Sequence, residues 1–206
     1  MIELNRREFL LGSTALVGLC LLAGPAFALD VAEINKAPAI GEMSMGPEDA
    51  KVTLIEFASA SCPHCAAFYN DTFATLKSEY IDTGKIRFVF REFPHNDAGL
   101  AAFMLARSVP KDSYFPMIDI FFKTQATWLT NWPEGLSNIA KQAGITKESF
   151  DKILKDQALA KGILDVRDQA SGFGVTGVPT FFLNGERLEG EVTIETLREK
   201  IDPLLT

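Results

Sequence analysis

The stretch VTLIEFASASCPHC, residues 52–65, joins an apolar run to two cysteines that lie three positions apart. The run from Val52 to Phe57 is rich in β-branched and aromatic residues, which favour a buried strand. The cysteines follow within a few residues, where Pro63 is tolerated in the first turn of a helix. The stretch therefore predicts a strand, a short connection and a helix that opens on the two cysteines.

The position of the cysteines favours redox chemistry. A thiol at a helix N-terminus faces unpaired backbone N–H groups and the positive end of the helix dipole, and both favour the thiolate. Cys62 and Cys65 lie on one face of the first turn, close enough to close a small disulfide ring. The chain therefore presents a dithiol that could be oxidised and reduced reversibly.

A structural disulfide and a zinc site are the two alternatives. A bridge between residues three apart closes a small loop and removes little entropy from the unfolded chain. Zinc usually takes four ligands from two such pairs, and the two histidines, His64 and His95, offer no recognisable second pair. The redox dithiol is favoured over both, and we expect no metal and no cofactor.

Residues 1–28 resemble an export signal. Arg6-Arg7 supply a charged start, Phe9 to Leu22 an apolar region, and Ala26-Phe27-Ala28 a cleavage site of the A-x-A type. The arginine pair is compatible with a twin-arginine signal and with an ordinary secretory signal. Cleavage would remove Cys20, and it would leave the two motif cysteines in an oxidising compartment.

The composition is acidic. The chain carries 27 Asp and Glu against 20 Lys and Arg, a formal net charge of −7. A chain of this charge without basic clusters is a poor binder of nucleic acid. After the signal it is still long enough to bury a substantial core.

The order of expected elements begins as strand, helix, strand. We expect strands at 51–58 and 85–93 and a helix at 63–82 between them. This order implies a right-handed crossover and parallel pairing of the two strands. The pattern then becomes helical, with candidate helices at 97–108, 112–127, 133–143, 147–154 and 157–171.

The C-terminal part returns to strands. Strands are expected at 180–183 and 187–189, joined by Asn184-Gly185, a strong hairpin signal. A last helix at 193–205 has Thr193 as its candidate cap.

This order predicts an α/β protein, a thioredoxin-like fold with an inserted helical domain. The expected segments are the export signal, a lead-in, the two parts of the thioredoxin-like domain and the insertion between them. Their bounds are 1–28 for the signal, 29–44 for the lead-in, 45–96 and 173–206 for the thioredoxin-like parts, and 97–172 for the insertion.

Three motifs make the chain resemble the DsbA family of periplasmic thiol:disulfide oxidoreductases over about residues 45–205. The first is Cys62-Pro63-His64-Cys65, whose central dipeptide is typical of that family. The second is Glu56, six residues before Cys62, which matches a buried acidic residue. The third is Thr176-Gly177-Val178-Pro179-Thr180, which matches a loop whose proline is cis and faces the active site.

The resemblance gives the motif residues roles. It implies that Cys62 is an exposed nucleophile and that Cys65, one turn inside the helix, is the buried resolving thiol. Pro63 and His64 would set the redox potential, with His64 favouring the Cys62 thiolate. We expect His95 to be a plain loop residue.

Two further features have an open alternative. Glu56 is expected to relay a proton for Cys65, while the alternative places it facing outward on an edge strand. Val178 and Pro179 are expected to bind substrate by pairing their backbone with an extended client segment. The alternative is an ordinary loop.

The function that the resemblance implies is the introduction of disulfide bonds into exported proteins in the periplasm. The partners would be reduced, unfolded exported proteins and a quinone-linked membrane reoxidant of the DsbB type, and the protein would be a monomer. The alternatives are a periplasmic reductase or isomerase and a non-catalytic, chaperone-like binder of unfolded chains.

Overall fold

A five-stranded sheet forms the centre of the protein. The computed structural model describes residues 31–206, so the expected export signal lies outside the described residues. The strands run in the order β1-β3-β2-β4-β5, and only β2 and β3 pair in parallel. Their bounds are β1 Met43–Met45, β2 Val52–Ala58, β3 Ile86–Glu92, β4 Thr180–Leu183 and β5 Glu186–Arg187.

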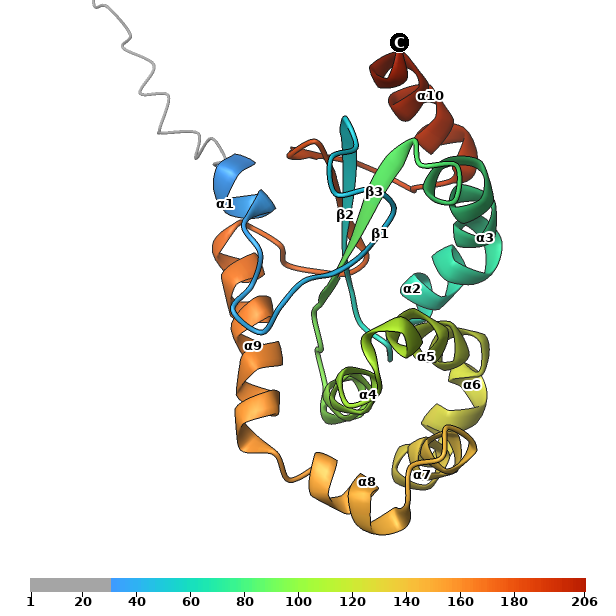
Figure 1. Cartoon of the computed structure of the whole chain (residues 1–206), viewed down its shortest axis with the longest axis vertical. Helices are drawn as coiled ribbons and strands as arrows, with labels where there is room; N and C mark the ends of the chain where they lie inside the picture. The colour runs from blue at the N-terminus through green and yellow to red at the C-terminus, as the bar shows by residue number, and fades with distance from the viewer. Residues whose placement is uncertain (1–30) are drawn as a thin grey trace, which may run out of the picture.

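A long helix and the C-terminal helix cover one face of the sheet, and α9 and α1 lie on the other side (Figure 1). The long helix corresponds to the expected helix at 63–82 and contains two π-helical segments. Its parts are α2 Pro63–Phe68, η1 Tyr69–Phe73, α3 Ala74–Leu76 and η2 Lys77–Ile81. The other three are α10 Ile194–Leu205, α9 Gln157–Gly172 and α1 Val31–Asn35.

The side chains of β2 alternate between these two faces. Leu54 and Ala58 belong to the core beneath α2, whereas Ile55 and Phe57 pack with Ala170 of α9. A strand with both faces buried is expected to be almost wholly apolar. This burial explains why the sequence of β2 is an apolar run and why its one carboxylate is unusual.

The part of the expected insertion that precedes α9 lies at one end of the sheet, whereas α9, also within 97–172, packs on a face of the sheet (Figure 1). Its helices are α4 Asp97–Arg107, α5 Lys111–Lys123, α6 Gln125–Trp128, α7 Trp132–Gln142 and α8 Lys147–Ile153, with a 3-10 turn, η3, at Leu129–Asn131. The helix expected at 112–127 is divided near Thr124. The ring centroids of Phe122 in α5 and of Tyr69 in the long helix lie 4.2 Å apart. The insertion therefore shares one core with the sheet.

The expected lead-in contributes to the sheet. β1 lies across the expected boundary between 29–44 and 45–96, and it pairs with β3 in antiparallel register, with Met43 opposite Phe90. Before it, Glu42 forms ion pairs with Arg87 and Arg91 of β3. The sequence did not reveal this strand because three residues carry no measurable periodicity.

A buried ion pair joins the sheet to the insertion. Arg107 donates two hydrogen bonds to the Glu92 carboxylate, at 2.6 and 2.8 Å, and Tyr114 donates a third at 2.7 Å. Arg107 also donates to the carbonyls of Ile40 and Gly41. One guanidinium thus fixes the lead-in, β3 and α4 relative to one another.

The hairpin turn and the C-terminal helix follow the sequence, whereas β5 begins one residue earlier and ends two residues earlier than the strand expected at 187–189. Asn184 and Gly185 both have positive φ, at 47° and 86°, as the expected hairpin turn requires. Thr193 and Thr196 form a reciprocal capping box at the start of α10. Within residues 31–206, no helix combines the length and the apolar run that crossing a membrane requires.

Candidate active site

The two cysteines occupy the N-terminus of α2. Cys62 is the N-cap residue, and Cys65 lies in the first turn. The exposed fractions of the two residues are 5% and 0%. Cys65 is therefore the more buried, as expected, but the expectation that Cys62 is exposed is wrong. The loop before β4 covers it, and the Cys62 thiol donates a hydrogen bond of 3.3 Å to the carbonyl of Val178.

The surroundings of Cys62 favour its thiolate. The pKa of Cys62 is lowered to about 6, chiefly by a hydrogen bond from the Cys65 thiol. Burial opposes this shift, while the backbone N–H groups of Cys65 and His64 and the positive charge of His95 support it. A thiol with this pKa is largely ionised at neutral pH.

Cys65 has the opposite tendency. Burial raises the pKa of the Cys65 thiol far above its usual range, and its hydrogen bond to Cys62 and the charge of Glu56 act in the same direction. The two thiols therefore differ in their protonation at neutral pH: Cys62 is the thiolate, and Cys65 keeps its proton. This asymmetry gives the pair one nucleophile and one protonated partner.

Glu56 is fully buried beneath the active-site helix. It lies on the central strand β2, between Phe90 of β3 and Phe181 of β4, so the alternative of an outward position on an edge strand is wrong. No described protein group forms a hydrogen bond with either of its side-chain oxygens. Burial raises the pKa of this carboxyl well above its usual value, and the negative charge of Cys62 raises it further.

The loop facing the cysteines has the expected conformation. The Val178–Pro179 peptide bond is cis. Beside it, the Thr180 hydroxyl donates a 2.7 Å hydrogen bond to the carbonyl of Gly177. The loop and the cysteines meet because β4 pairs with β2, which ends just before the motif.

Gln125 of α6 was not recognised in the sequence as a site residue. Its side-chain amide is buried and donates to the carbonyls of Ala60 and Cys62, at 2.9 and 3.0 Å. It therefore fixes the connection between β2 and α2. A polar residue at the end of a predicted helix gave no signal of this contact.

The two histidines act on Cys62 in different ways. The charge of His95 lowers the pKa of Cys62, whereas His64 acts on that thiol through its backbone N–H. The His64 side chain is exposed and lines a neighbouring cavity. His95 was expected to be a plain loop residue because its sequence neighbours carry no motif. Only the fold brings the end of β3 beside the helix start.

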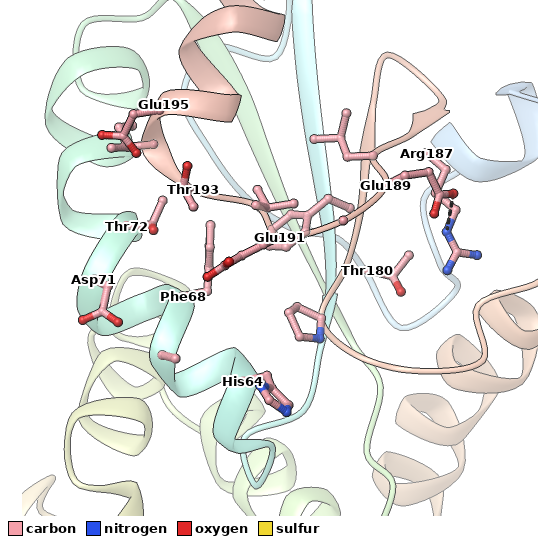
Figure 2. A pocket seen from close by; sticks show the side chains of 17 residues that line it. His64, Phe68, Asp71, Thr72, Thr180, Arg187, Glu189, Glu191, Thr193 and Glu195 are labelled. Carbon is pink, nitrogen blue, oxygen red and sulfur yellow. Dashed lines mark ion pairs between the residues drawn. The ribbon is translucent and has the colours of Figure 1, made fainter.

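A cavity of about 750 Å³ lies beside the motif, between α2, the hairpin and the start of α10 (Figure 2). Part of its lining is apolar, formed by Phe68, Phe181, Leu188, Val192 and Ile194. Acidic side chains also line it, namely Asp71, Glu189, Glu191 and Glu195. Arg187 pairs with Glu189 at 3.4 Å. Such a cavity offers apolar contacts and a negative field next to the thiols.

No set of metal ligands accompanies the thiols. The part of the chain that the structure describes brings together no group of three or more His, Cys, Asp or Glu residues that could hold a metal ion. The chemistry that the site itself supports is thiol–disulfide exchange.

Known proteins resemble this chain in sequence. Residues 39–203 match the family model described as thioredoxin. A Rickettsia bellii relative with the provisional name protein-disulfide oxidoreductase is 34% identical over 78% of this chain and 63% of its own length. The disulfide bond formation protein D of Bacillus subtilis is 25% identical over 82% of this chain and 80% of its own. The chain thus spans less than two thirds of the rickettsial relative.

Solved structures agree. The α-DsbA1 of Wolbachia pipientis superposes with a TM-score of 0.77 at 26% identity, covering 84% of this chain and 95% of that protein. BdbD of Bacillus subtilis superposes with a TM-score of 0.71 at 25% identity, and the match covers 82% of this chain and 96% of that protein. The resemblance to DsbA proteins and the thioredoxin-like fold with many helices are therefore confirmed.

Proposed function

Because the chain belongs to the thioredoxin family, we propose that it is a thiol:disulfide oxidoreductase that introduces disulfide bonds into exported proteins through Cys62 and Cys65. The observation that carries this proposal is the asymmetry between the thiols. The pKa of Cys62 is lowered to about 6, while that of Cys65 is raised. A stabilised Cys62 thiolate favours the reduced protein, so the disulfide form readily oxidises other thiols.

The reaction is a pair of disulfide exchanges. A client thiolate attacks the Cys62 sulfur of the oxidised protein, the Cys62–Cys65 bond breaks, and Cys65 leaves and takes up a proton. A second client thiolate then attacks the client sulfur of this mixed disulfide, and Cys62 leaves as a thiolate. The client gains a disulfide, and the protein takes up two electrons as its dithiol.

Neighbouring residues would assist these steps. Glu56, buried beneath α2, would exchange the proton of Cys65. Pro63 and His64 would tune the potential from within the motif. Val178 and Pro179 would hold the client, since the Val178 carbonyl lies next to the Cys62 sulfur and would accept a backbone hydrogen bond once that thiol is ionised or bonded to the client.

The compartment and the partners belong to the same proposal. We infer export to the periplasm from the signal-like residues 1–28, by a twin-arginine or a secretory route. Reduced, unfolded exported proteins would be the clients, and a quinone-linked membrane protein of the DsbB type would reoxidise the dithiol. The cavity beside His64 would receive the client segment next to its cysteine.

The test uses the oxidised protein without residues 1–28 and an unfolded peptide with two cysteines. We expect stoichiometric conversion of the peptide to its disulfide and loss of that conversion in Cys62→Ala. Reduced Cys65→Ala, mixed with the disulfide form of the peptide, should instead accumulate a mixed disulfide between Cys62 and the peptide, because the variant lacks the thiol that would resolve it. A Cys62→Ala variant that still oxidises the peptide would refute the proposal. Binding of the peptide without exchange would support the chaperone-like alternative.

The equilibrium with glutathione separates an oxidase from a reductase or isomerase. A dithiol with a stabilised thiolate should stay reduced in glutathione mixtures that keep ordinary protein disulfides oxidised. If the Cys62–Cys65 disulfide instead has a reduction potential as low as that of a structural disulfide, the protein acts as a reductase.

A further inference from the structure

Tyr69 shares a buried layer with Cys65 and Glu56. Cys65 and Tyr69 lie four positions apart, on one face of the active-site helix, and their residues are 0% and 5% exposed. Glu56 lies on the same side of β2 as Leu54 and Ala58, which belong to the core beneath that helix. The thiol, the hydroxyl and the carboxyl therefore all belong to the interface between the helix and the sheet.

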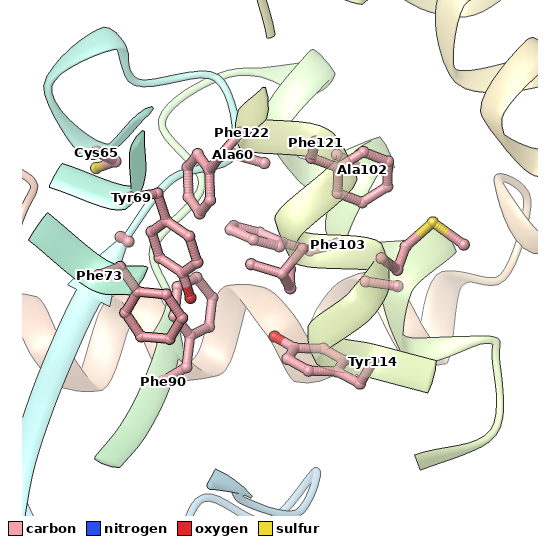
Figure 3. Close-up of a cluster of buried hydrophobic side chains, with 14 of the residues drawn as sticks. Ala60, Cys65, Tyr69, Phe73, Phe90, Ala102, Phe103, Tyr114, Phe121 and Phe122 are labelled. Atoms are coloured by element: carbon pink, nitrogen blue, oxygen red, sulfur yellow. The ribbon is translucent and has the colours of Figure 1, made fainter. Parts of the chain in front are cut away.

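Phe90 relates the tyrosine to the carboxyl. It is the register partner of Glu56 in the parallel pair of β2 and β3. The ring of Tyr69 meets Phe90 edge to face, with centroids 6.3 Å apart. Figure 3 shows Cys65 and Tyr69 on the helix, with Phe73, Phe90 and Phe122 around the tyrosine ring.

Apolar rings hold the tyrosine in place. Its centroid lies 4.2 Å from that of Phe73 and 4.2 Å from that of Phe122. These contacts account for the ring, and they would be the same for phenylalanine. They leave the hydroxyl group unexplained.

The tyrosine hydroxyl and both Glu56 oxygens are buried, and no described protein group forms a hydrogen bond with any of them. Buried polar atoms nearly always have a partner, which is either protein or water. A hydroxyl donates, and an ionised carboxylate accepts. Burial raises the pKa of Tyr69, and the charges of Glu56, of Asp119 on α5 and of Cys65 raise it further, in that order. The carboxyl of Glu56 and the thiol of Cys65 therefore both interact electrostatically with the Tyr69 hydroxyl.

We propose that Tyr69 is a positioning residue for the proton transfer between Cys65 and Glu56, because its hydroxyl donates a hydrogen bond to one buried water that in turn donates to the Glu56 carboxylate. This proposal rests on the thiol–disulfide exchange proposed above, and it adds a third group to that site. It assigns a use to a hydroxyl that the packing of the core does not need.

The proton transfer accompanies the resolving step. The Cys65 thiol gives its proton to the Glu56 carboxylate, and its sulfur attacks the Cys62 sulfur of a mixed disulfide. The Cys62–Cys65 bond forms, and the bond to the second molecule breaks, so that this molecule leaves as a thiolate. In the reverse direction the protonated Glu56 returns the proton to Cys65. The hydroxyl of Tyr69 stabilises the ionised carboxylate that accepts the proton.

Tyr69→Phe removes the hydroxyl and keeps the ring contacts. The reduced protein without residues 1–28 is mixed with oxidised glutathione, quenched with acid and resolved by mass. We expect the mixed disulfide to disappear about tenfold more slowly than in the parent at neutral pH, the effect of losing one hydrogen bond to a charged group. The deficit should shrink as the pH rises, because Glu56 then ionises without help.

Tyr80→Phe is the matched control. The Tyr80 hydroxyl donates to Asp202 at 2.7 Å, so its removal leaves the Glu56 layer intact. This variant should follow the pH profile of the parent. The proposal would be overturned if Tyr69→Phe had the same pH profile as the parent and Tyr80→Phe. It would also be overturned if Tyr69→Phe lowered the resolving rate equally at every pH, because such a loss indicates altered packing.

Glu56→Gln tests whether the tyrosine acts through the carboxyl. In this background Tyr69→Phe should cause no further change of the resolving rate, whereas an additive loss would refute the assigned role. Infrared titration of the Glu56 carboxyl supplies a readout that needs no catalysis, and its midpoint should rise in Tyr69→Phe. Since glutathione replaces the client, these results remain informative even if oxidation of proteins fails.

Discussion

The Cys62 thiol donates a hydrogen bond to the carbonyl of Val178, which lies 116 positions further along the chain. The donor begins the active-site helix, and the acceptor precedes the cis bond to Pro179. A thiolate has no proton to donate, so ionisation of Cys62 releases this carbonyl. The same atom then becomes an acceptor for the backbone of an extended client. The contact therefore couples the charge of the nucleophile to the proposed client-binding loop.

The titration of Cys62 is the first prediction. Thiolate absorbance of the reduced protein should show a transition near pH 6, which is absent in Cys62→Ser. Cys65→Ala should move this transition upward, because the hydrogen bond from Cys65 is the largest favourable contribution. A transition near the ordinary cysteine value of about 8.5 in the parent would contradict the electrostatics of the site.

The two histidines provide the second prediction. His95→Ala removes a positive charge that favours the Cys62 thiolate, and His64→Ala removes the imidazole of the motif. We expect His95→Ala to raise the pKa of Cys62 and to make the protein a weaker oxidant by several-fold in the equilibrium with glutathione, whereas His64→Ala, which keeps the backbone N–H beside the thiol, should change both quantities less. Measuring both variants decides which imidazole contributes more. If neither moves the equilibrium, the helix N-terminus and Cys65 alone tune the site.

Stability in the two redox states is the third prediction. The pKa of Cys62 is depressed by folding, so its contribution is fully present above the unfolded value of about 8.5 and is lost as the pH falls through about 6. We expect the reduced protein to be the more stable form at neutral pH. Its advantage should grow by on the order of 2 kcal/mol across this pH window.

Denaturant unfolding of the reduced and oxidised protein at several pH values measures this difference. Cys62→Ser supplies the control, since it lacks the titrating thiol. An advantage of the reduced form that does not change with pH would exclude the thiolate as its cause.

Glu56 gives the fourth prediction. Burial raises the pKa of Glu56, so the folded state binds a proton that the unfolded state releases, and stability falls as the pH rises above about 4.3. Glu56→Gln should therefore be more stable than the parent at neutral pH, by about 1–3 kcal/mol, and should resolve mixed disulfides more slowly. The exposed Glu148→Gln serves as the control for both measurements. A Glu56→Gln variant that is no more stable than the parent at neutral pH would contradict the destabilising effect of burying this carboxyl.

Local patterns in the sequence were sufficient for the elements and for the centre of the site. The apolar run of β2, the helix that opens on the cysteines and the Asn184-Gly185 turn depend on residues close together in the chain. Their backbone preferences and hydrophobic periodicity act over a few residues. The same holds for Glu56, whose charge within an apolar strand was visible without a structure.

Only the tertiary structure decided how distant segments meet around the thiols. It placed Val178 over Cys62, brought His95 near the same sulfur and directed Gln125 onto the backbone before the helix. It also buried Tyr69 in the layer that contains Glu56. None of these contacts leaves a periodic signal, because each depends on the packing of separate elements into one shared core. The sequence by itself thus determined the dithiol, and the fold determined which groups set its protonation.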